Sequence, residues 1–225
     1  MSSYRRAQQE RNSYINRLHA LFVSQGITTK VRKDLAESES RKEAIKELRD
    51  IEREEAEHLV AILDLTEKCI EALEKKIAEE AKEDEVIERL QSVPGVGLIT
   101  SFAFAAHIAP DRFGNASQVS NHLGLVPRVY ISGDTVKYGS ITKRGNGYLR
   151  ALLVQASWAL IRSGNGGKLK ELYQYMTIKN SKSKKKAIVA IARRLAELLY
   201  LIMRDEVRYV KMPFIREEED AKKAA

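Results

Sequence analysis

Cysteine is nearly absent from this sequence, and no apolar segment is long enough to cross a membrane. The single cysteine, Cys69, has no second thiol with which to form an intrachain disulfide or a cysteine-based zinc site. No stretch reaches about 18 uninterrupted apolar residues, and the first residues lack the apolar run of a signal peptide. We therefore expect a soluble protein of a reducing cytoplasm, not a secreted or membrane-spanning one.

Acidic residues are scarce in one segment of the chain. Residues 127–194 contain 15 lysines and arginines but only two acidic residues, Asp134 and Glu171. Residues 91–225 as a whole hold 22 basic and 10 acidic residues, a net charge of +12, whereas residues 1–90 hold 17 and 21, a net charge of −4. Such a basic bias is typical of surfaces that neutralise phosphates. We therefore expect the second half of the chain to bind nucleic acid.

Glycine and proline are both missing between Ser40 and Pro94, which predicts a long helix. Ser40 and Glu43 form a possible capping box at its start, and a continuous helix over residues 41–82 would reach roughly 60 Å. Its apolar positions step by threes and fours, as in a coiled-coil seam: Ala56, Leu59, Leu63, Thr66, Ile70, Leu73 and Ile77. This seam must pack either on an earlier helix, which ends at Gln25 and Gly26, or on the same arm of a second molecule. The second case would make the protein a homo-oligomer.

A turn with the sequence Ser-Val-Pro-Gly-Val-Gly, residues 92–97, separates two apolar helical segments. In a helix-hairpin-helix, glycines such as Gly95 and Gly97 let the backbone amides of the second helix approach a DNA phosphate. A Pro-Gly turn between helices also needs no ligand at all. From this turn alone, a phosphate-binding hairpin and a turn without a ligand have equal weight. The basic segment downstream favours the DNA-binding interpretation.

The apolar period then changes to that of a β-hairpin. Residues 128–131 and 135–138 are rich in β-branched and aromatic side chains, and Ser132, Gly133 and Asp134 lie between them. Ser132 is thus predicted at the tip of the hairpin. Ser-Gly-Asp is ordinary turn chemistry, so most such serines form turns and are not nucleophiles. The residues predict no Ser-His-Asp set around it.

Three further helices follow the hairpin. Basic residues lie in the hairpin, in the loop after it and in these helices. Asn146 or Gly147 opens the first helix, residues 168–176 form a short one, and the last begins at the lysine cluster 182–186. Lysines there oppose the helix dipole, which suggests an external anion. The candidate nucleic-acid contacts are Gly95, Gly97, Arg128, Lys143, Arg144, Arg150, Lys184, Lys185 and Lys186. We expect a mainly α fold: a coiled-coil arm over residues 1–85, a compact helical domain over 86–212, and a charged tail over 213–225.

Several motifs occur in this chain in the same order as in one transposase family. They are Ser92–Gly97, Asp111–Phe113, Leu123–Arg128, Ser132–Gly133, Ile141–Gly145 and Leu149–Arg150. The chain resembles the C-terminal part of the IS110 family of bacterial insertion-sequence transposases. Residues 11–27 are similar to the region that follows the acidic domain in the IS1111 group of that family.

This resemblance implies DNA strand cleavage and rejoining, in which Ser132 attacks DNA and forms a transient phosphoserine link. It also implies an RNase H-like domain with a D-E-D-D metal set that binds Mg²⁺, and a structured guide RNA. No D-E-D-D set is identifiable here, so we expect this chain to lack that domain and to bind no metal itself. The expected partners are transposon-end and target DNA and guide RNA, at the nucleoid in bacterial cytoplasm. The alternative is a non-catalytic, truncated protein that occupies transposon ends.

Overall fold

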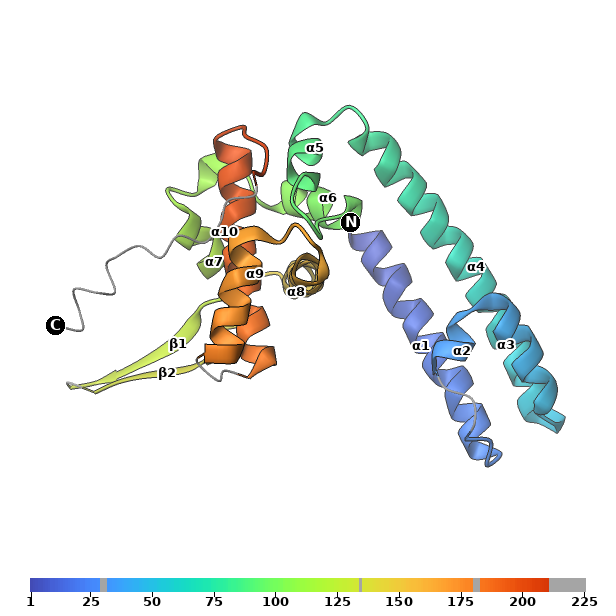
Figure 1. The fold of residues 1–225 in the computed structure, drawn as a ribbon. Coiled ribbons are helices and arrows are strands. Elements are labelled where there is room, and N and C mark those ends of the chain that lie inside the picture. The colour runs from blue at the N-terminus through green and yellow to red at the C-terminus, as the bar shows by residue number, and fades with distance from the viewer. Residues whose placement is uncertain (29–31, 134, 180–182, 211–225) are drawn as a thin grey trace. The chain divides into compact units, whose positions relative to one another are not determined.

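The computed structural model describes residues 1–28, 32–133, 135–179 and 183–210, and the tail predicted over 213–225 lies outside them. The chain divides into two compact units, Met1–Glu79 and Glu80–Ala225. The described residues are mainly helical, with one antiparallel pair of strands (Figure 1). The predicted mainly α fold class is confirmed. None of the described helices combines the length and the apolar composition that crossing a bilayer requires.

The first unit is built on two antiparallel helices. Its elements are α1 (Ser2–Ser24), α2 (Arg32–Ala36), α3 (Ser38–Ala44), a 3-10 turn (Ile45–Glu47) and α4 (Asp50–Ala81). Side-chain pairs joining α1 to α4 run in opposite directions along the two helices: Tyr4 to Glu74, Arg11 to Glu67, and Arg17 to Glu55. Leu59 and Leu63 of the α4 seam share a buried cluster with Leu18 and Phe22 of α1. The apolar seam of α4 therefore packs against α1 of the same chain.

The prediction of one continuous helix over residues 41–82 is wrong. Helix α3 already begins at Ser38, and the hydroxyl of Ser40 donates to Glu37, so Ser40 caps no long helix. The chain leaves the helical conformation at Leu48, and α4 begins only at Asp50, which has a φ of +52°. Leu48 is 1% exposed, because the break turns its side chain into the apolar cluster. This burial outweighs the helical propensity of the segment.

The second unit surrounds a central helix, α10 (Lys184–Arg204). Its other elements are α5 (Glu85–Gln91), α6 (Leu98–His107), a 3-10 turn (Pro110–Arg112), α7 (Ala116–His122), β1 (Pro127–Ser132), β2 (Thr135–Ile141), α8 (Gly147–Arg162), α9 (Gly167–Gln174) and a π-helical turn (Tyr175–Lys179). Apolar residues such as Ile191, Leu195 and Leu199 are fully buried on α10, which packs against α5, α7, α8 and α9. The predicted cap of α8 is confirmed, because Asn146 Oδ1 accepts from the amides of Tyr148 and Leu149.

The predicted hairpin is also confirmed, as the antiparallel pair β1 and β2. The two strands extend away from the helices of their unit (Figure 1). Every described residue from Arg128 to Ser140 is exposed. The hairpin thus lies outside the helical core and carries Ser132 at its end.

Candidate nucleic-acid interface

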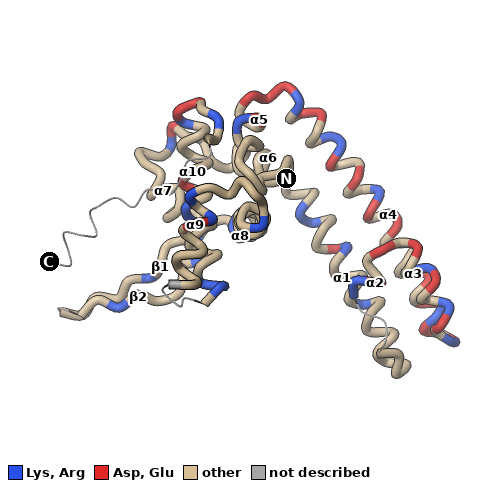
Figure 2. Tube along the Cα trace, in the orientation of Figure 1, with Lys and Arg blue, Asp and Glu red and all other residues tan. Residues whose placement is uncertain are grey.

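The strand register gives the hairpin two chemically different faces. Val129 pairs with Tyr138 and Ile131 with Val136, and directly opposed residues share a face of a sheet. On the other face, Tyr130 pairs with Lys137 and Ser132 with Thr135. One face is therefore mainly apolar, with the ring of Tyr138, and the other carries the hydroxyls of Ser132 and Thr135 and a cation. Basic residues occur on both strands, Arg128 on β1 and Lys137 on β2 (Figure 2).

Ser132 is the last residue of β1 and is exposed on the polar face. Gly133 follows it with a φ of +58°, the left-handed conformation that a tight turn requires. Asp134, the third residue of the predicted turn, lies outside the described residues. No hydrogen bond within the described chain holds the Ser132 hydroxyl, so this oxygen is open to a ligand from solvent.

The candidate cations differ in how free their side chains are. Arg128, Lys143 and Arg144 are exposed on β1 and on the loop that follows β2. The lysines at 184, 185 and 186 are exposed in the first turn of α10, where Ser183 makes no side-chain cap. Arg150 is half-buried, and its Nη1 donates to the carbonyl oxygens of Leu123 at 3.0 Å, Arg144 at 2.7 Å and Gly145 at 3.3 Å.

The two glycines of the Pro-Gly turn have different surroundings. Gly95 has a φ of +85°, and a Cβ there would lie 2.5 Å from the carbonyl oxygen of Ala156 and the amide nitrogen of Leu160. The turn between α5 and α6 thus packs directly on the backbone of α8, which explains Gly95 without a ligand. Gly97 precedes the first residue of α6, and a Cβ added there would meet no atom within 4 Å. Of the two glycines, only Gly97 leaves open space at this helix start.

Residues 87–174 match the profile of the IS116/IS110/IS902 transposase family. This is the family whose motifs the sequence resembles. It is 31% identical over 137 residues to the transposase for insertion sequence element IS1111A of Coxiella burnetii, a match that covers 60% of this chain and 38% of that protein. It is 39% identical over 101 residues to a probable family 20 transposase of Pseudomonas aeruginosa, covering 44% of this chain and 30% of the relative. The chain thus spans well under half the length of these relatives.

The matched transposase segment contains most of the candidate site. It includes the turn with Gly95 and Gly97, the whole hairpin with Ser132, and the cations from Arg128 to Arg150. The lysines at 184, 185 and 186 lie beyond its end. The structure brings the hairpin, the loop after it and the start of α8 together, because Arg150 contacts that loop.

A buried carboxylate of the second unit is not marked by any pattern in the sequence. Glu197 of α10 is 7% exposed and accepts hydrogen bonds from Ser120, Arg193 and Arg194. Burial alone would raise the pKa of Glu197, but the hydrogen bonds from Ser120 and Arg193 and the two arginine charges lower it below its ordinary value. The hydrogen bond from Ser120 therefore joins α7 to α10, and the two arginines hold the same carboxylate from its own helix.

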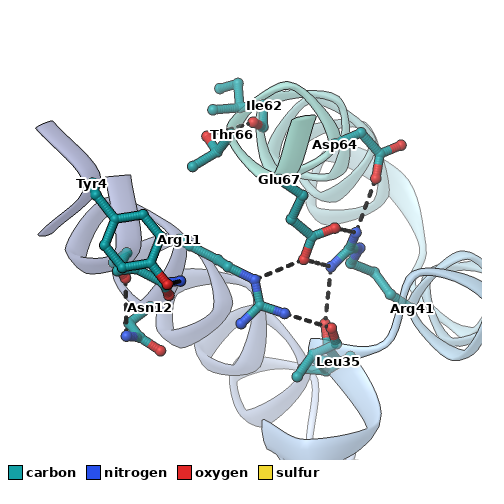
Figure 3. Close-up of polar contacts among 11 residues, drawn as sticks. Tyr4, Arg11, Asn12, Leu35, Arg41, Ile62, Asp64, Thr66 and Glu67 are labelled. Carbon is teal, nitrogen blue, oxygen red and sulfur yellow. Dashed lines mark hydrogen bonds and ion pairs between the residues drawn. The ribbon is translucent and has the colours of Figure 1, made fainter. Parts of the chain in front are cut away.

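The first unit contains a second buried charge cluster (Figure 3). Arg41 of α3 is fully buried and donates to Asp64 at 2.9 Å and to Glu67 at 2.8 Å, and Arg11 of α1 donates to the same Glu67 at 2.8 Å. Burial opposes the charge of Glu67, but the hydrogen bonds from Arg41 and Arg11 lower its pKa. The cluster ties three helices together. Along α4 as a whole, acidic residues outnumber basic ones (Figure 2).

The described residues do not fit the metal set that the family resemblance implies. In the four described ranges, no three His, Cys, Asp or Glu side chains are grouped so that they could hold an ion. The half-buried carboxylate of Glu67 and the buried carboxylate of Glu197 are each paired with arginines. No step of the chemistry below is therefore assigned to a metal held by this chain.

Proposed function

We propose that this chain is the serine-bearing part of an insertion-sequence transposase, and that Ser132 is the nucleophile that attacks DNA. The observation that supports this most strongly is the position of Ser132. It is exposed at the end of a projecting hairpin, on a face that also carries Lys137, within the segment that matches the transposase family. An exposed hydroxyl on the same face of the hairpin as a cation suits attack on a phosphodiester.

In the proposed reaction, Ser132 Oγ forms a bond to phosphorus while the bond from phosphorus to the departing sugar oxygen breaks. The serine proton passes to a base, and the departing oxygen gains a proton. The phosphoserine link conserves the bond energy until the hydroxyl of another strand attacks it and releases Ser132. The described residues place no base beside the hydroxyl, so we assign that base to a partner of the chain.

The exposed cations supply the proposed DNA contacts. Arg128, Lys143 and Arg144 lie around the hairpin, and three lysines, 184, 185 and 186, lie at the start of α10. Cations at such positions neutralise phosphates and position the duplex without reading its sequence. Guide RNA, with the same phosphate backbone, is a second proposed partner of this surface. Gly97 at the start of α6 is the proposed backbone contact to a phosphate. DNA as a substrate would place the protein at the nucleoid in the cytoplasm.

We also propose that the first unit joins two copies of the chain. A second apolar stripe follows α4 at heptad spacing, distinct from the seam buried on α1: Ile62, Leu65, Cys69 and Ala72. All four are exposed, with Leu65 at 68%. Strand exchange needs at least two active sites, so pairing through this stripe would provide two serines.

The relatives are more than twice as long as their matched regions, which leaves room in them for an acidic domain that binds Mg²⁺. We assign the metal chemistry to such a domain, acting together with this chain. The second candidate function is a protein that binds transposon ends without cutting them. It rests on the misfit between the described residues and the implied metal set.

A Ser132→Ala variant separates the two functions. The full chain is incubated with labelled transposon-end DNA, guide RNA, a supplied acidic domain and magnesium, then denatured and run on a gel. We expect a slow protein-DNA band from the wild type and none from the variant, with equal DNA affinity for both. Salt-sensitive binding without any covalent band would support the non-catalytic protein instead.

A further inference from the structure

Two segments of the chain cross at the base of the hairpin in direct backbone contact. One ends α7 at residues 122–124, and the other leaves β2 at residues 143–145. Gly124 and Gly145 have φ values of +65° and +75°, and a Cβ on either would overlap the backbone of the opposite segment. The amide of Lys143 donates to Gly124 O at 3.1 Å, and that of Thr142 donates to Val126 O at 2.9 Å. The crossing therefore leaves no room for a side chain at Gly124 or at Gly145.

Arg150 binds both segments of this crossing at once. Its Nη1 donates to Leu123 O on the first segment and to Arg144 O and Gly145 O on the second, at 2.7 to 3.3 Å. The residue lies on the first turns of α8, next to Leu149, which is fully buried in the core. Hydrogen bonds from a charged donor are stronger than those from a neutral one. The side chain therefore connects the base of the hairpin to a rigid helix.

The hairpin depends on this connection because few other interactions hold it. Beyond Arg150, the pairing of its own strands and the backbone hydrogen bonds of the crossing, no hydrogen bond or ion pair among the described residues joins the hairpin to its unit. Both of its faces are exposed, and a two-stranded ribbon alone is marginally stable. At about 3.3 Å per residue, Ser132 lies about 17 Å along β1 from Pro127. A rotation of about 10° at the base would move it by about 3 Å, and misplacement by about 1 Å can cost 100-fold in rate.

We propose that Arg150 is a positioning residue, which fixes the base of the hairpin and so aims Ser132, and that it is not a phosphate ligand. The proposal rests on the proposed function of Ser132, and it replaces the phosphate contact predicted for Arg150. The N–H groups of Arg150 Nη1 already donate to three carbonyl oxygens, so this nitrogen is not available to a phosphate. Arg144, the neighbouring exposed arginine, keeps the role of phosphate contact.

The test compares Arg150→Gln with Arg144→Gln in the full chain, since the two variants lose the same charge six residues apart. Amide hydrogen exchange is measured at Leu125, Thr142 and Lys143, and DNA affinity is measured over a range of salt concentrations. We expect Arg150→Gln to speed exchange of these base amides about tenfold or more while α8 and α10 stay protected. Its salt slope should equal that of the wild type. Arg144→Gln should keep wild-type exchange and lower the salt slope by about 1.

The opposite pattern, a lowered salt slope with unchanged exchange in Arg150→Gln, would overturn the proposal. If Arg150→Gln exposes the amides of α8 and α10 as well, Arg150→Lys is measured instead, because one ammonium cannot reach three carbonyls in the same geometry. If the amides at the base of the hairpin exchange as slowly in Arg150→Lys as in the wild type, the proposal is also overturned. Absence of DNA binding or of covalent capture by the wild type would remove the proposed function of Ser132, yet the exchange result would still decide the role of Arg150 in the hairpin.

Discussion

The hydroxyl of Ser120 on α7 donates to the carboxylate of Glu197 on α10 at 2.7 Å. Helix α7 leads directly into the hairpin, so this bond fixes the element from which β1 departs. Glu197 is also held by Arg193 and Arg194 from its own helix, and its pKa is lowered by these partners despite its burial. The carboxylate thus stabilises the second unit in its charged form.

We expect Glu197→Gln to lower the free energy of unfolding by about 1–3 kcal/mol at neutral pH, because it removes the negative charge that faces two arginines and replaces one acceptor oxygen with an NH2 donor. A carboxyl whose pKa is lower in the folded state stabilises the fold above its unfolded pKa, and this stabilisation is lost as the pH falls through the folded value. The difference between wild type and variant should therefore shrink as the pH falls below the unfolded pKa of glutamate, about 4.3, and through the lower folded pKa. Urea denaturation at several pH values checks this, and a difference that stays constant with pH would contradict it.

Arg41→Met should destabilise the first unit by about 3–5 kcal/mol, because it leaves Asp64 and Glu67 without their buried cation. Thermal unfolding followed by circular dichroism measures this. Lys46→Met is the matched control, since Lys46 pairs with Glu43 on the exposed surface of the same unit. Exposed pairs contribute little, so equal losses in the two variants would refute the role given to the buried cluster.

Gly95→Ala and Gly97→Ala separate packing from phosphate binding in the Pro-Gly turn. We expect Gly95→Ala to destabilise the second unit by more than about 1 kcal/mol, because its Cβ meets the backbone of α8 at a positive φ. Gly97→Ala should leave stability nearly unchanged, because its Cβ points into open space. Chemical denaturation and DNA affinity are measured for both. A stable Gly95→Ala protein would show that the turn does not pack as described.

Leu65→Lys should weaken self-association of the chain, because it places a charge in the exposed stripe of α4. Sedimentation velocity over a range of concentrations measures the effect. Val23→Lys is the control, because Val23 is an exposed apolar residue of α1, away from that stripe. A monomeric wild type, or equal weakening by both variants, would argue against pairing through this stripe.

Periodic and turn signals in the sequence predicted the hairpin, the cap of α8 and the last helix, because each depends on local side-chain chemistry. The break before α4 was missed, because Leu48 enters the apolar core only through tertiary packing that no local pattern encodes. The same reason hides Arg41, Glu197 and Arg150. Each is an ordinary charged residue in sequence, and its role depends on partners 3 to 77 positions away. Conversely, Gly95 was predicted as a possible phosphate contact, and only its distance to α8 shows a packing role.

The most direct test of the account is to identify the residue that carries DNA after the reaction. The full chain is incubated with transposon-end DNA, guide RNA, a supplied acidic domain and magnesium, then digested with nuclease and trypsin and analysed by mass spectrometry. We predict a nucleotide adduct on the peptide of residues 129–137, localised to Ser132 and absent from the Ser132→Ala variant. An adduct on another residue, or none while DNA remains bound, would contradict the assignment of Ser132 as the nucleophile.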